Sequence, residues 1–468
     1  SVTLLQVTST VAALPNVLDA ALVMATDLNR EVLAESGLLF DDAATAGPND
    51  LAIAVRASDA GSADAALRTA EALLAEQRGT NGASAAQKPP RTIGSAVRRQ
   101  PDANVAVVSV PGQYAAAEAR QALAAGLHVF LFSDNVSLDD EIELKRRARD
   151  LGLLMMGPDC GTSIINGVGL GFANVVRRGR IGLIGASGTG LQEVTTLLDR
   201  AGAGVSHAIG CGGRDLHDSV GGITTLQALD LLRGDPATEV IVLISKPPSP
   251  SVAERVLHAA AATGKQVVAC LLGATLEALP GVEVVSNLYQ TARAAAGATG
   301  EWPTMNKEDL PRLRRQPGQD QVRGLYCGGT LCEEAELALG PGHELIDFGD
   351  DRYTRGRAHP MIDPSLRHHA ILAAAEDPRV AIVLLDVILG FAAHMDPAGL
   401  LAPVVREATE RATRAGRQLS VLAHVVGSVG DPQGLARQEE VLRGVGVHLF
   451  GSNYHAAVAA ALVLEQVR

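Results

Sequence analysis

The stretch from Ile181 to Glu193 reads IGLIGASGTGLQE, an apolar run followed by a Gly-rich turn and the start of a helical pattern. Such a turn presents free backbone N–H groups at the positive end of a helix dipole, which suits a bound anion. No GKS or GKT follows the glycines and the spacing is not GxGxxG, which excludes the two common nucleotide-binding motifs. A plain helix N-cap by Ser187 or Thr189, with glycines that allow close packing, is the alternative interpretation.

Polar loops follow other apolar runs of the chain. The segment GCGGRDLHDSVGG contains Arg214 and His217 among five glycines, and its counterpart DFGDDRYTRGRAHPMIDP contains Arg352, Arg355, Arg357 and His359. The planar fork of a guanidinium suits a carboxylate or a phosphate, and a surface ion pair is the alternative role for each arginine. The SKPP turn adds Lys246 at a strand end, again suited to an anion.

Metal and thiol chemistry are not indicated by the spacing of the histidines and cysteines. The histidines near expected strand ends show neither HxxxH nor HExxH spacing, so no metal site is expected. The five cysteines are scattered, odd in number and without a CxxC pair, which favours a reducing cytoplasm over a disulfide framework. Cys160 in MGPDCGTS invites interpretation as a nucleophile, but a buried structural thiol is favoured.

Length and charge narrow the class of protein. At 468 residues the chain needs several domains, and its net charge of -12 opposes binding to nucleic acid. No basic segment precedes a long apolar one, so neither a signal peptide nor a membrane span is expected. The sequence starts at Ser1, so an earlier strand could be missing.

An internal repeat organises the chain. Gly-rich turns recur at Thr189 and Thr330, 141 residues apart, and Asp-Pro pairs recur at Asp235 and Asp377, 142 residues apart. Apolar runs that alternate with helical patterns predict an α/β protein with several doubly wound parallel-sheet (Rossmann/flavodoxin-like) domains. The expected order is a small N-terminal α+β domain (1–77), a linker (78–92), a Rossmann-like, CoA-binding-domain-like domain (93–178), a first CoA-ligase-like flavodoxin domain (179–300), a second linker (301–321) and a second such domain (322–468).

The sequence resembles the FdrA family almost from end to end. The resemblance rests on MGPDCGTSIINGVGLGFAN, GRIGLIGASGTGLQEV, GCGGRDLHDSVGG, LISKPP and HPMIDPSLR. FdrA proteins in turn resemble a fusion of the CoA-ligase portions of the succinyl-CoA synthetase α and β subunits: GPDCG is similar to GPNCPG, GRIGLIGASGTG to GKVGIVSRSGT, and AEDPRVAIVLLDVILG to DPKVKAVLVNIFGG. By this resemblance the turns at Ser187 and Gly390 correspond to the two helix N-termini that hold phosphate in the synthetase.

Departures from the synthetase define the expected function. The region that would match its phosphohistidine loop, VVACLLGATLEALPGVEVVSN, has no histidine, and neither an ATP-grasp domain nor a GFTGxQG turn is present. FdrA proteins are implicated in oxamate carbamoyltransferase, which converts oxalurate and phosphate into oxamate and carbamoyl phosphate during allantoin breakdown. The resemblance therefore implies an oligomeric complex with accessory subunits, phosphate as a substrate and no CoA cofactor.

The site residues follow from the motifs and the resemblance together. Phosphate or carbamoyl phosphate is assigned to Ser187, Gly188 and Thr189 with the backbone of Gly390 and Phe391. The substrate is assigned to Arg214, Arg352, Arg355, Arg357 and Asn174, and His217 and His359 are the candidate general acids. Two alternatives stay open: a subunit of an ADP-forming acyl-CoA synthetase, and a noncatalytic ligand-binding scaffold of a multi-subunit complex.

Overall fold

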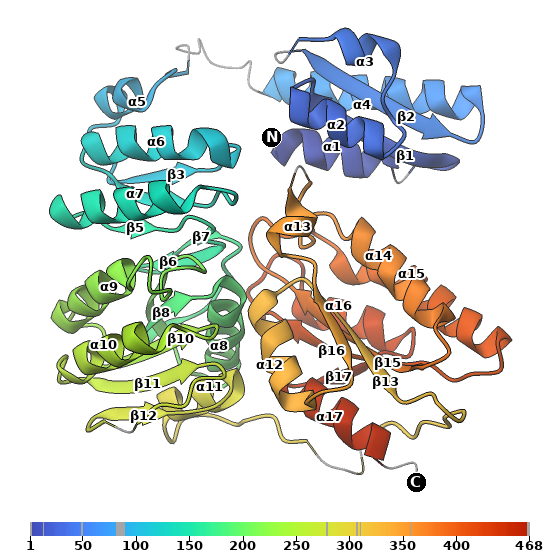
Figure 1. Cartoon of the computed structure of the whole chain (residues 1–468). Coiled ribbons are helices and arrows are strands. Elements are labelled where there is room, and N and C mark those ends of the chain that lie inside the picture. The colour runs from blue at the N-terminus through green and yellow to red at the C-terminus, as the bar shows by residue number, and fades with distance from the viewer. Residues whose placement is uncertain are drawn as a thin grey trace. The chain divides into compact units, whose positions relative to one another are not determined.

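The computed structural model describes residues 2–12, 14–47, 50–80, 89–277, 279–305, 308, 310–355 and 357–465. Its contacts divide the chain into two compact units (Figure 1). Unit 1 comprises Ser1–Arg91 with Thr354–Ala358, and unit 2 comprises Thr92–Tyr353 with His359–Arg468. The expected linker at 78–92 falls partly outside the described residues.

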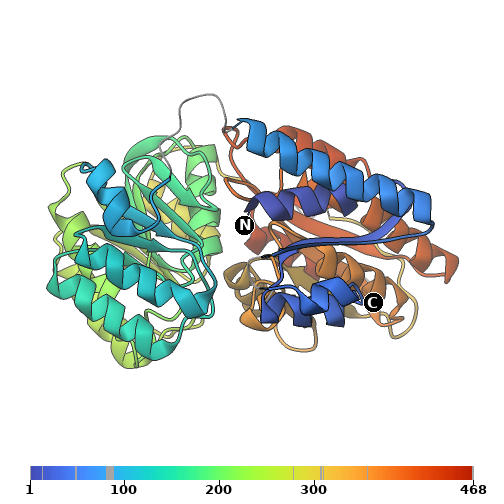
Figure 2. The ribbon, with the colours of Figure 1, turned by 90° about the horizontal axis from the view of Figure 1, so that it is seen from above.

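Unit 1 is a two-stranded antiparallel sheet with helices on both faces (Figure 2). Alternation along β1 directs Leu22 toward one set of helices and partly buried Val23 toward the other. Val7 and Ala70 of the helices α1 and α4 pack on the first face, and Leu33 of α2 packs on the second. The elements are α1 (Val2–Ala12), β1 (Val17–Met24), α2 (Asp27–Glu35), α3 (Asp41–Thr45), β2 (Leu51–Ala57) and α4 (Ala60–Thr80).

Unit 2 begins with a three-stranded parallel sheet in the order β3-β4-β5. The Ala-rich face of α6 packs on it through buried positions such as Ala115, Ala119 and Ala122, at the spacing of one helix face. The elements are α5 (Ile93–Arg99), β3 (Val105–Val108), α6 (Gly112–Ala124), β4 (His128–Leu131), α7 (Leu138–Asp150) and β5 (Met155–Met156).

A seven-stranded sheet follows, in the order β12-β11-β10-β8-β9-β6-β7. Its five parallel strands, β8 to β12, form what we call the first repeat domain, and the antiparallel β6–β7 hairpin extends the sheet beyond β9. Its elements are β6 (Thr162–Ile165), β7 (Val168–Gly171), β8 (Arg178–Ala186), α8 (Gly188–Arg200), β9 (Val205–Gly210), α9 (Ile223–Gly234), β10 (Val240–Ser245), α10 (Pro250–Ala261), β11 (Gln266–Leu271), β12 (Val282–Val284) and α11 (Leu288–Ala296).

The second repeat domain is a five-stranded parallel sheet in the order β14-β13-β15-β16-β17. Every residue of β15 is buried, as expected of a central strand covered on both faces. The elements are β13 (Gln321–Tyr326), α12 (Gly329–Leu339), β14 (Glu344–Asp347), α13 (Asp351–Thr354), α14 (Ser365–Glu376), β15 (Val380–Ile388), α15 (Pro397–Arg414), β16 (Ser420–Val426), α16 (Leu435–Arg443), β17 (His448–Phe450) and α17 (Asn453–Glu465).

Both repeat domains have the same topology. Numbered from the first strand of each domain, the parallel strands lie in the order 2-1-3-4-5, which is the flavodoxin-like doubly wound arrangement. Helices α8 and α11 of the first domain and α12 and α17 of the second share one hydrophobic core, in which Leu191, Leu288, Leu331 and Ala456 are buried. The predicted fold class is therefore confirmed, and the two domains pack on each other through equivalent helices.

Candidate functional site

The turn after β8 holds α8 by a side-chain cap. The Ser187 Oγ accepts a hydrogen bond from the Gly190 N–H at 2.9 Å, and a Cβ at position 190 would collide with that oxygen. Among the described residues no hydrogen-bond acceptor meets the N–H groups of Gly188 and Thr189. The first turn of α8 therefore keeps free donors at the positive end of its dipole.

A buried carboxylate fixes the equivalent turn, which follows β13. The Asp386 carboxylate of β15 accepts the N–H of Cys327 at 2.8 and 3.1 Å and the N–H of Gly328 at 2.8 Å. Arg367 donates to the Asp386 carbonyl oxygen and lies 3.3 Å from the carboxylate. This pairing compensates the buried charge and fixes the start of α12.

The two turns face each other across the boundary between the repeat domains. The hydroxyls of Ser187 and Thr330 are hydrogen-bonded at 2.6 Å, and a Cβ on Gly328 would lie 2.8 Å from the Thr189 Oγ1. Each turn sits where the strand order of its sheet reverses, which is where open α/β sheets bind ligands. Two helix N-termini are thus brought together by the equivalent turns of the two repeat domains.

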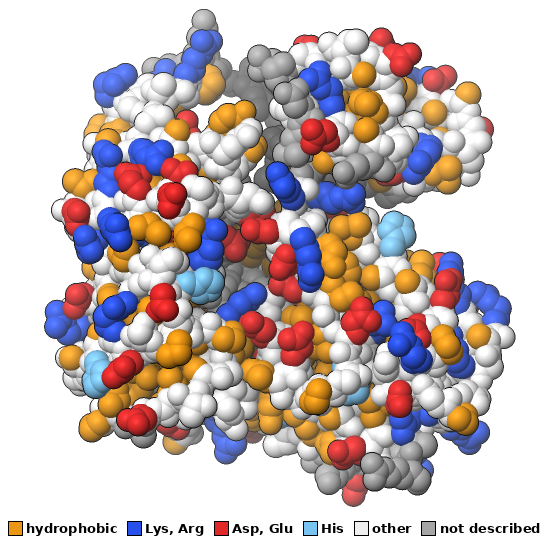
Figure 3. Space-filling model, in the orientation of Figure 1, with side chains coloured by type: hydrophobic (Ala, Val, Ile, Leu, Met, Phe, Trp, Pro, Cys, Tyr) orange, Lys and Arg blue, Asp and Glu red, His pale blue; other side chains and the backbone are white. Residues whose placement is uncertain are grey.

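Lys246 and Asp347 complete this meeting point. Lys246 follows β10 and Asp347 ends β14; the Lys246 Nζ lies 3.9 Å from the Asp347 Oδ2, and both approach Gly329 so closely that a Cβ there would collide with them. Burial raises the pKa of Asp347 to about 6, and Lys246 opposes the rise. On the face drawn in Figure 3, basic and acidic side chains lie next to each other where the repeat domains meet.

Asp159, in the GPDCG turn after β5, belongs to the same electrostatic environment. Its backbone has a φ of 53°, a conformation that non-glycine residues adopt rarely and that is concentrated at functional sites. The residue is exposed, but desolvation by the surrounding protein raises the pKa of its carboxyl to about 7. The negative charges of Asp351 and Asp134 add to this rise, and the positive charges of Lys246 and Arg214 oppose it. A carboxyl that titrates near neutrality can carry a proton in acid–base chemistry.

Cys160, next in the chain, is 2% exposed, and burial raises the pKa of its thiol to about 12. It remains a protonated, structural thiol at neutral pH.

A buried polar network ties α8 and α12 across the boundary. Glu193 of α8 accepts a hydrogen bond from the Asn453 N–H at the start of α17 at 3.1 Å and pairs with the His424 Nε2 at 2.9 Å. Glu334 of α12, again 141 positions later, accepts the Leu288 N–H at the start of α11 at 2.7 Å. Each repeat domain therefore caps the last helix of the other one.

The sequence assigned Arg214 and Asn174 to the substrate, and the structure gives both of them protein partners. The Arg214 Nε donates to the Glu141 Oε2 at 2.8 Å, and Glu141 also pairs with Lys145, whose buried ammonium reaches Asp215 at 2.7 Å. Asn174, 2% exposed, donates to the Asp431 Oδ2 at 2.7 Å. Both side chains brace their loops in this arrangement.

The backbone of Gly390 and Phe391 is also engaged. The Gly390 N–H donates to the Gln433 Oε1 at 3.2 Å and the Phe391 N–H to the Ala173 carbonyl oxygen at 2.9 Å. No helix begins at Gly390; α15 begins at Pro397, capped by Asp396. These two N–H groups are therefore not free for an anion, unlike those of Gly188 and Thr189.

The remaining candidates lie in different settings. His217 is exposed in its loop, and Arg352 is exposed, with its Nε 3.6 Å from Asp350. Arg355 and Arg357 are exposed in the segment Thr354–Ala358, which belongs to unit 1 and not to the unit with the paired turns.

His359 packs against Phe172, with ring centroids 5.3 Å apart, and its Nδ1 accepts the Met361 N–H at 3.3 Å. Burial lowers the pKa of His359 to about 4, so its imidazole is neutral at pH 7 and can offer an Nε2–H donor but not an acidic proton.

The described ranges contain no group of three or more His, Cys, Asp or Glu side chains that could hold a metal ion. No helix in the same ranges is both long and apolar enough to cross a membrane.

The paired flavodoxin-like domains with facing Gly-rich turns define a protein built from CoA-binding and CoA-ligase modules. Residues 176–273 match the CoA binding domain, residues 325–463 match the CoA-ligase domain, and residues 1–90 match the "AllF, heavy metal-associated domain". The CoA-binding match thus covers the first repeat domain and not residues 93–178, where the sequence had suggested such a module.

YahF of Escherichia coli (strain K12) is 41% identical over 496 aligned positions, which cover 98% of this chain and 95% of YahF. The chain belongs to the YahF family.

More distant relatives share only part of the chain. The mitochondrial succinate–CoA ligase [ADP-forming] subunit alpha-2 of Trichomonas vaginalis is 29% identical over 230 residues, covering 47% of this chain and 72% of that subunit. The apo dinucleotide-forming acetyl-coenzyme A synthetase 1 of Ca. Korarchaeum cryptofilum covers 78% of this chain and 83% of its own at 16% identity, with a TM-score of 0.33, which is too low for structural detail to be carried across.

Residues 1–90 contain neither cysteine nor histidine. The domain that matches a heavy metal-associated model therefore has no thiolate or imidazole ligand, and the thioether of Met24 is its one soft ligand.

The sequence assignment did not include Asp159 or Asp347 among the site residues. It gave Lys246 only as a residue suited to an anion. Lys246 directly follows a parallel strand, Asp347 ends one and Asp159 lies three residues after one, and this position was the available signal.

Proposed function

We propose that this chain is a subunit of a carbamoyltransferase that transfers a carbamoyl group between oxalurate and phosphate, giving oxamate and carbamoyl phosphate. The observation that carries the proposal is the convergence of Lys246 and the start of α12 with the free N–H groups at the start of α8. Phosphate needs several donors and a cation, and helix N-termini with a lysine supply them.

The proposed step needs no covalent enzyme intermediate. A phosphate oxygen attacks the carbamoyl carbon of oxalurate, the bond from that carbon to the amide nitrogen breaks, and oxamate leaves with a proton on this nitrogen. The proton comes from hydrogen phosphate. We assign its transfer to Asp159, whose pKa of about 7 suits both acceptance and release at neutral pH.

Charge develops on the phosphate and on the former carbonyl oxygen during the attack. The donors of Gly188 and Thr189 are fixed before the reaction by the Ser187 cap, so they would stabilise that charge without reorganisation. The ammonium of Lys246 would add a full positive charge on the other side.

Two further observations support the carbamoyl reaction over thioester formation. The strand and loop from Val267 to Asn287 contain no histidine that could carry a phosphoryl group. The AllF match of residues 1–90 points toward allantoin breakdown. We accordingly propose that accessory chains complete the complex and that CoA is not a cofactor.

A second candidate function is a subunit of an ADP-forming acyl-CoA synthetase. The matches of the two repeat domains to the CoA-binding and CoA-ligase modules favour it, as does the similarity to the Trichomonas subunit. In that reaction the same anion pocket would hold the phosphate of an acyl phosphate.

The deciding experiment uses the full chain co-expressed with the products of its neighbouring genes. Formation of carbamoyl phosphate from oxalurate and phosphate is measured beside thioester formation from CoA, ATP and a panel of carboxylic acids. Phosphate-dependent carbamoyl phosphate supports the proposal, whereas thioester without carbamoyl phosphate refutes it in favour of the synthetase.

The matched variants are Gly188→Ala and Thr413→Val. A Cβ at position 188 meets nothing closer than 3.5 Å, so Gly188→Ala should fold while its methyl group covers the phosphate donors. Thr413 is exposed on α15, away from the turns. Activity should fall in the first variant and persist in the second.

A further inference from the structure

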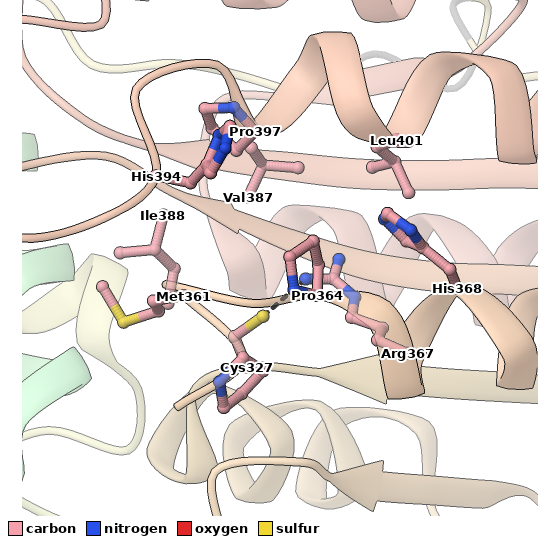
Figure 4. A pocket seen from close by; sticks show the side chains of 11 residues that line it. Cys327, Met361, Pro364, Arg367, His368, Val387, Ile388, His394, Pro397 and Leu401 are labelled. Atoms are coloured by element: carbon pink, nitrogen blue, oxygen red, sulfur yellow. Dashed lines mark hydrogen bonds between the residues drawn. The ribbon is translucent and has the colours of Figure 1, made fainter. Parts of the chain in front are cut away.

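The motif HPMIDPSLR forms one wall of a small pocket at the end of β13 and β15 (Figure 4). Pro360, Met361, Pro364 and Arg367 of the motif face Val387 and Ile388, and Leu401 of α15 closes another side. The cavity has a volume of about 20 Å³, which is room for a water molecule or for the head of a small ligand. It lies at the strand-order reversal of the second repeat domain, beside the turn that starts α12.

Two polar atoms of the pocket have no hydrogen-bond partner among the described residues. Arg367 is 4% exposed; two of its nitrogens serve Cys327 and Asp386, and its Nε has no partner among the described residues. The buried His368 Nε2 also lacks a partner in this part of the chain. Buried unpaired donors are rare in folded proteins, and here they line one cavity.

The electrostatics favour an acceptor-rich ligand. Burial lowers the pKa of His368 to about 4 and raises that of the Cys327 thiol to about 12, so both groups are neutral at pH 7. The His394 Nδ1 accepts the Asp396 N–H at 3.0 Å, which leaves its Nε2 as a donor. No carboxylate is among the described residues that line the pocket.

We propose that this pocket binds the planar carboxylate head of a small organic acid. Paired oxygens in one plane can accept from the Arg367 Nε and from an imidazole N–H at once, between apolar walls that exclude water. The inference rests on the proposed function only for the identity of the acid. The acid would be the carboxylate-bearing reactant of the carbamoyl transfer, and oxamate is the probe for it.

Titration calorimetry of the full chain with oxamate tests the site without turnover. We expect saturable binding whose Kd rises at least about tenfold in Arg367→Lys, which keeps a charge for Asp386 but loses the Nε donor. His368→Leu should weaken binding to a similar extent. His369→Leu is the matched control, because His369 is the next residue of α14 and is exposed; its Kd should stay within about twofold.

The two proposals fail in different ways. Gly188→Ala, which covers the phosphate donors, should lose carbamoyl transfer and leave oxamate binding unchanged, so carbamoyl transfer that persists in this variant counts against the phosphate assignment alone. If Arg367→Lys does not fold, His368→Leu and His369→Leu decide the question. The carboxylate site is refuted if oxamate does not bind up to about 10 mM, or if it binds equally well to His368→Leu.

Discussion

Replacing Lys246 by Met should weaken phosphate binding with little change in the fold. The Lys246 Nζ lies 3.9 Å from the Asp347 Oδ2, and an anion at the start of α12 would lie at a similar distance from it. Two unit charges about 4 Å apart attract by about 4 kcal/mol at an effective dielectric constant near 20 and by about 1 kcal/mol in bulk water. The side chain is 41% exposed, so we take about 2 kcal/mol, which corresponds to a roughly 30-fold higher KM for phosphate.

The assay is the dependence of carbamoyl phosphate formation on phosphate concentration at constant ionic strength. Lys246→Arg keeps the positive charge and should stay within a few-fold of the parent protein. Arg146→Met removes a charge from the exposed face of α7 and should leave the KM unchanged. An unchanged KM in Lys246→Met, with activity lost only through kcat, would contradict the assignment of Lys246 to phosphate binding.

Three more predictions concern ionisable groups. If Asp159 takes the proton from hydrogen phosphate and passes it to the leaving nitrogen, it must be ionised at the start, so activity should fall below about pH 7. Asp159→Asn should lower kcat by ~100-fold and abolish that ionisation in the pH–rate profile, whereas an unchanged profile would exclude the role. Burial raises the pKa of Glu334 to about 8 from an unfolded value of 4.5, so the folded chain holds a proton that the unfolded chain releases. Stability should therefore fall as the pH rises from 4.5 to 8, and Glu334→Gln should flatten this dependence in denaturation at pH 5, 7 and 9. Lys145→Met leaves the buried carboxylate of Asp215 without its cation, while Glu141 keeps Arg214, and should cost about 3–5 kcal/mol in urea unfolding; a change below about 1 kcal/mol would mean that the pair is dispensable.

The sequence was sufficient for the fold because local signals and the repeat agreed. Buried parallel strands read as continuous apolar runs, and the glycines at 188 and 329 marked both strand-to-helix turns. The offset of 141 residues made the turns at Thr189 and Thr330 equivalent before the contact between these turns was known. The β6–β7 hairpin was not predicted as part of the first sheet, because its pairing with β9 depends on residues more than forty positions away.

The site was predicted only in part, because each side chain's role depends on distant partners. Ser187, Gly188 and Thr189 lie at a helix start that their own spacing encodes. The N–H of Phe391, by contrast, donates to the Ala173 carbonyl oxygen, and Arg214 is paired with Glu141. Neither contact can be predicted from the local sequence. The convergence of Lys246 and Asp347 likewise arises only when the two repeat domains pack together.

The reciprocal capping by Glu193 and Glu334 makes each half of unit 2 an incomplete protein. A half produced alone would expose the apolar helix faces that now pack across the boundary, and its last helix would lose the carboxylate that accepts its first N–H. Two fragments made by cutting the chain between the repeat domains should therefore stay unfolded separately and recover their structure when mixed. The same exchange is what two identical chains would make about a twofold axis, so one polypeptide here supplies both sides of a symmetric contact.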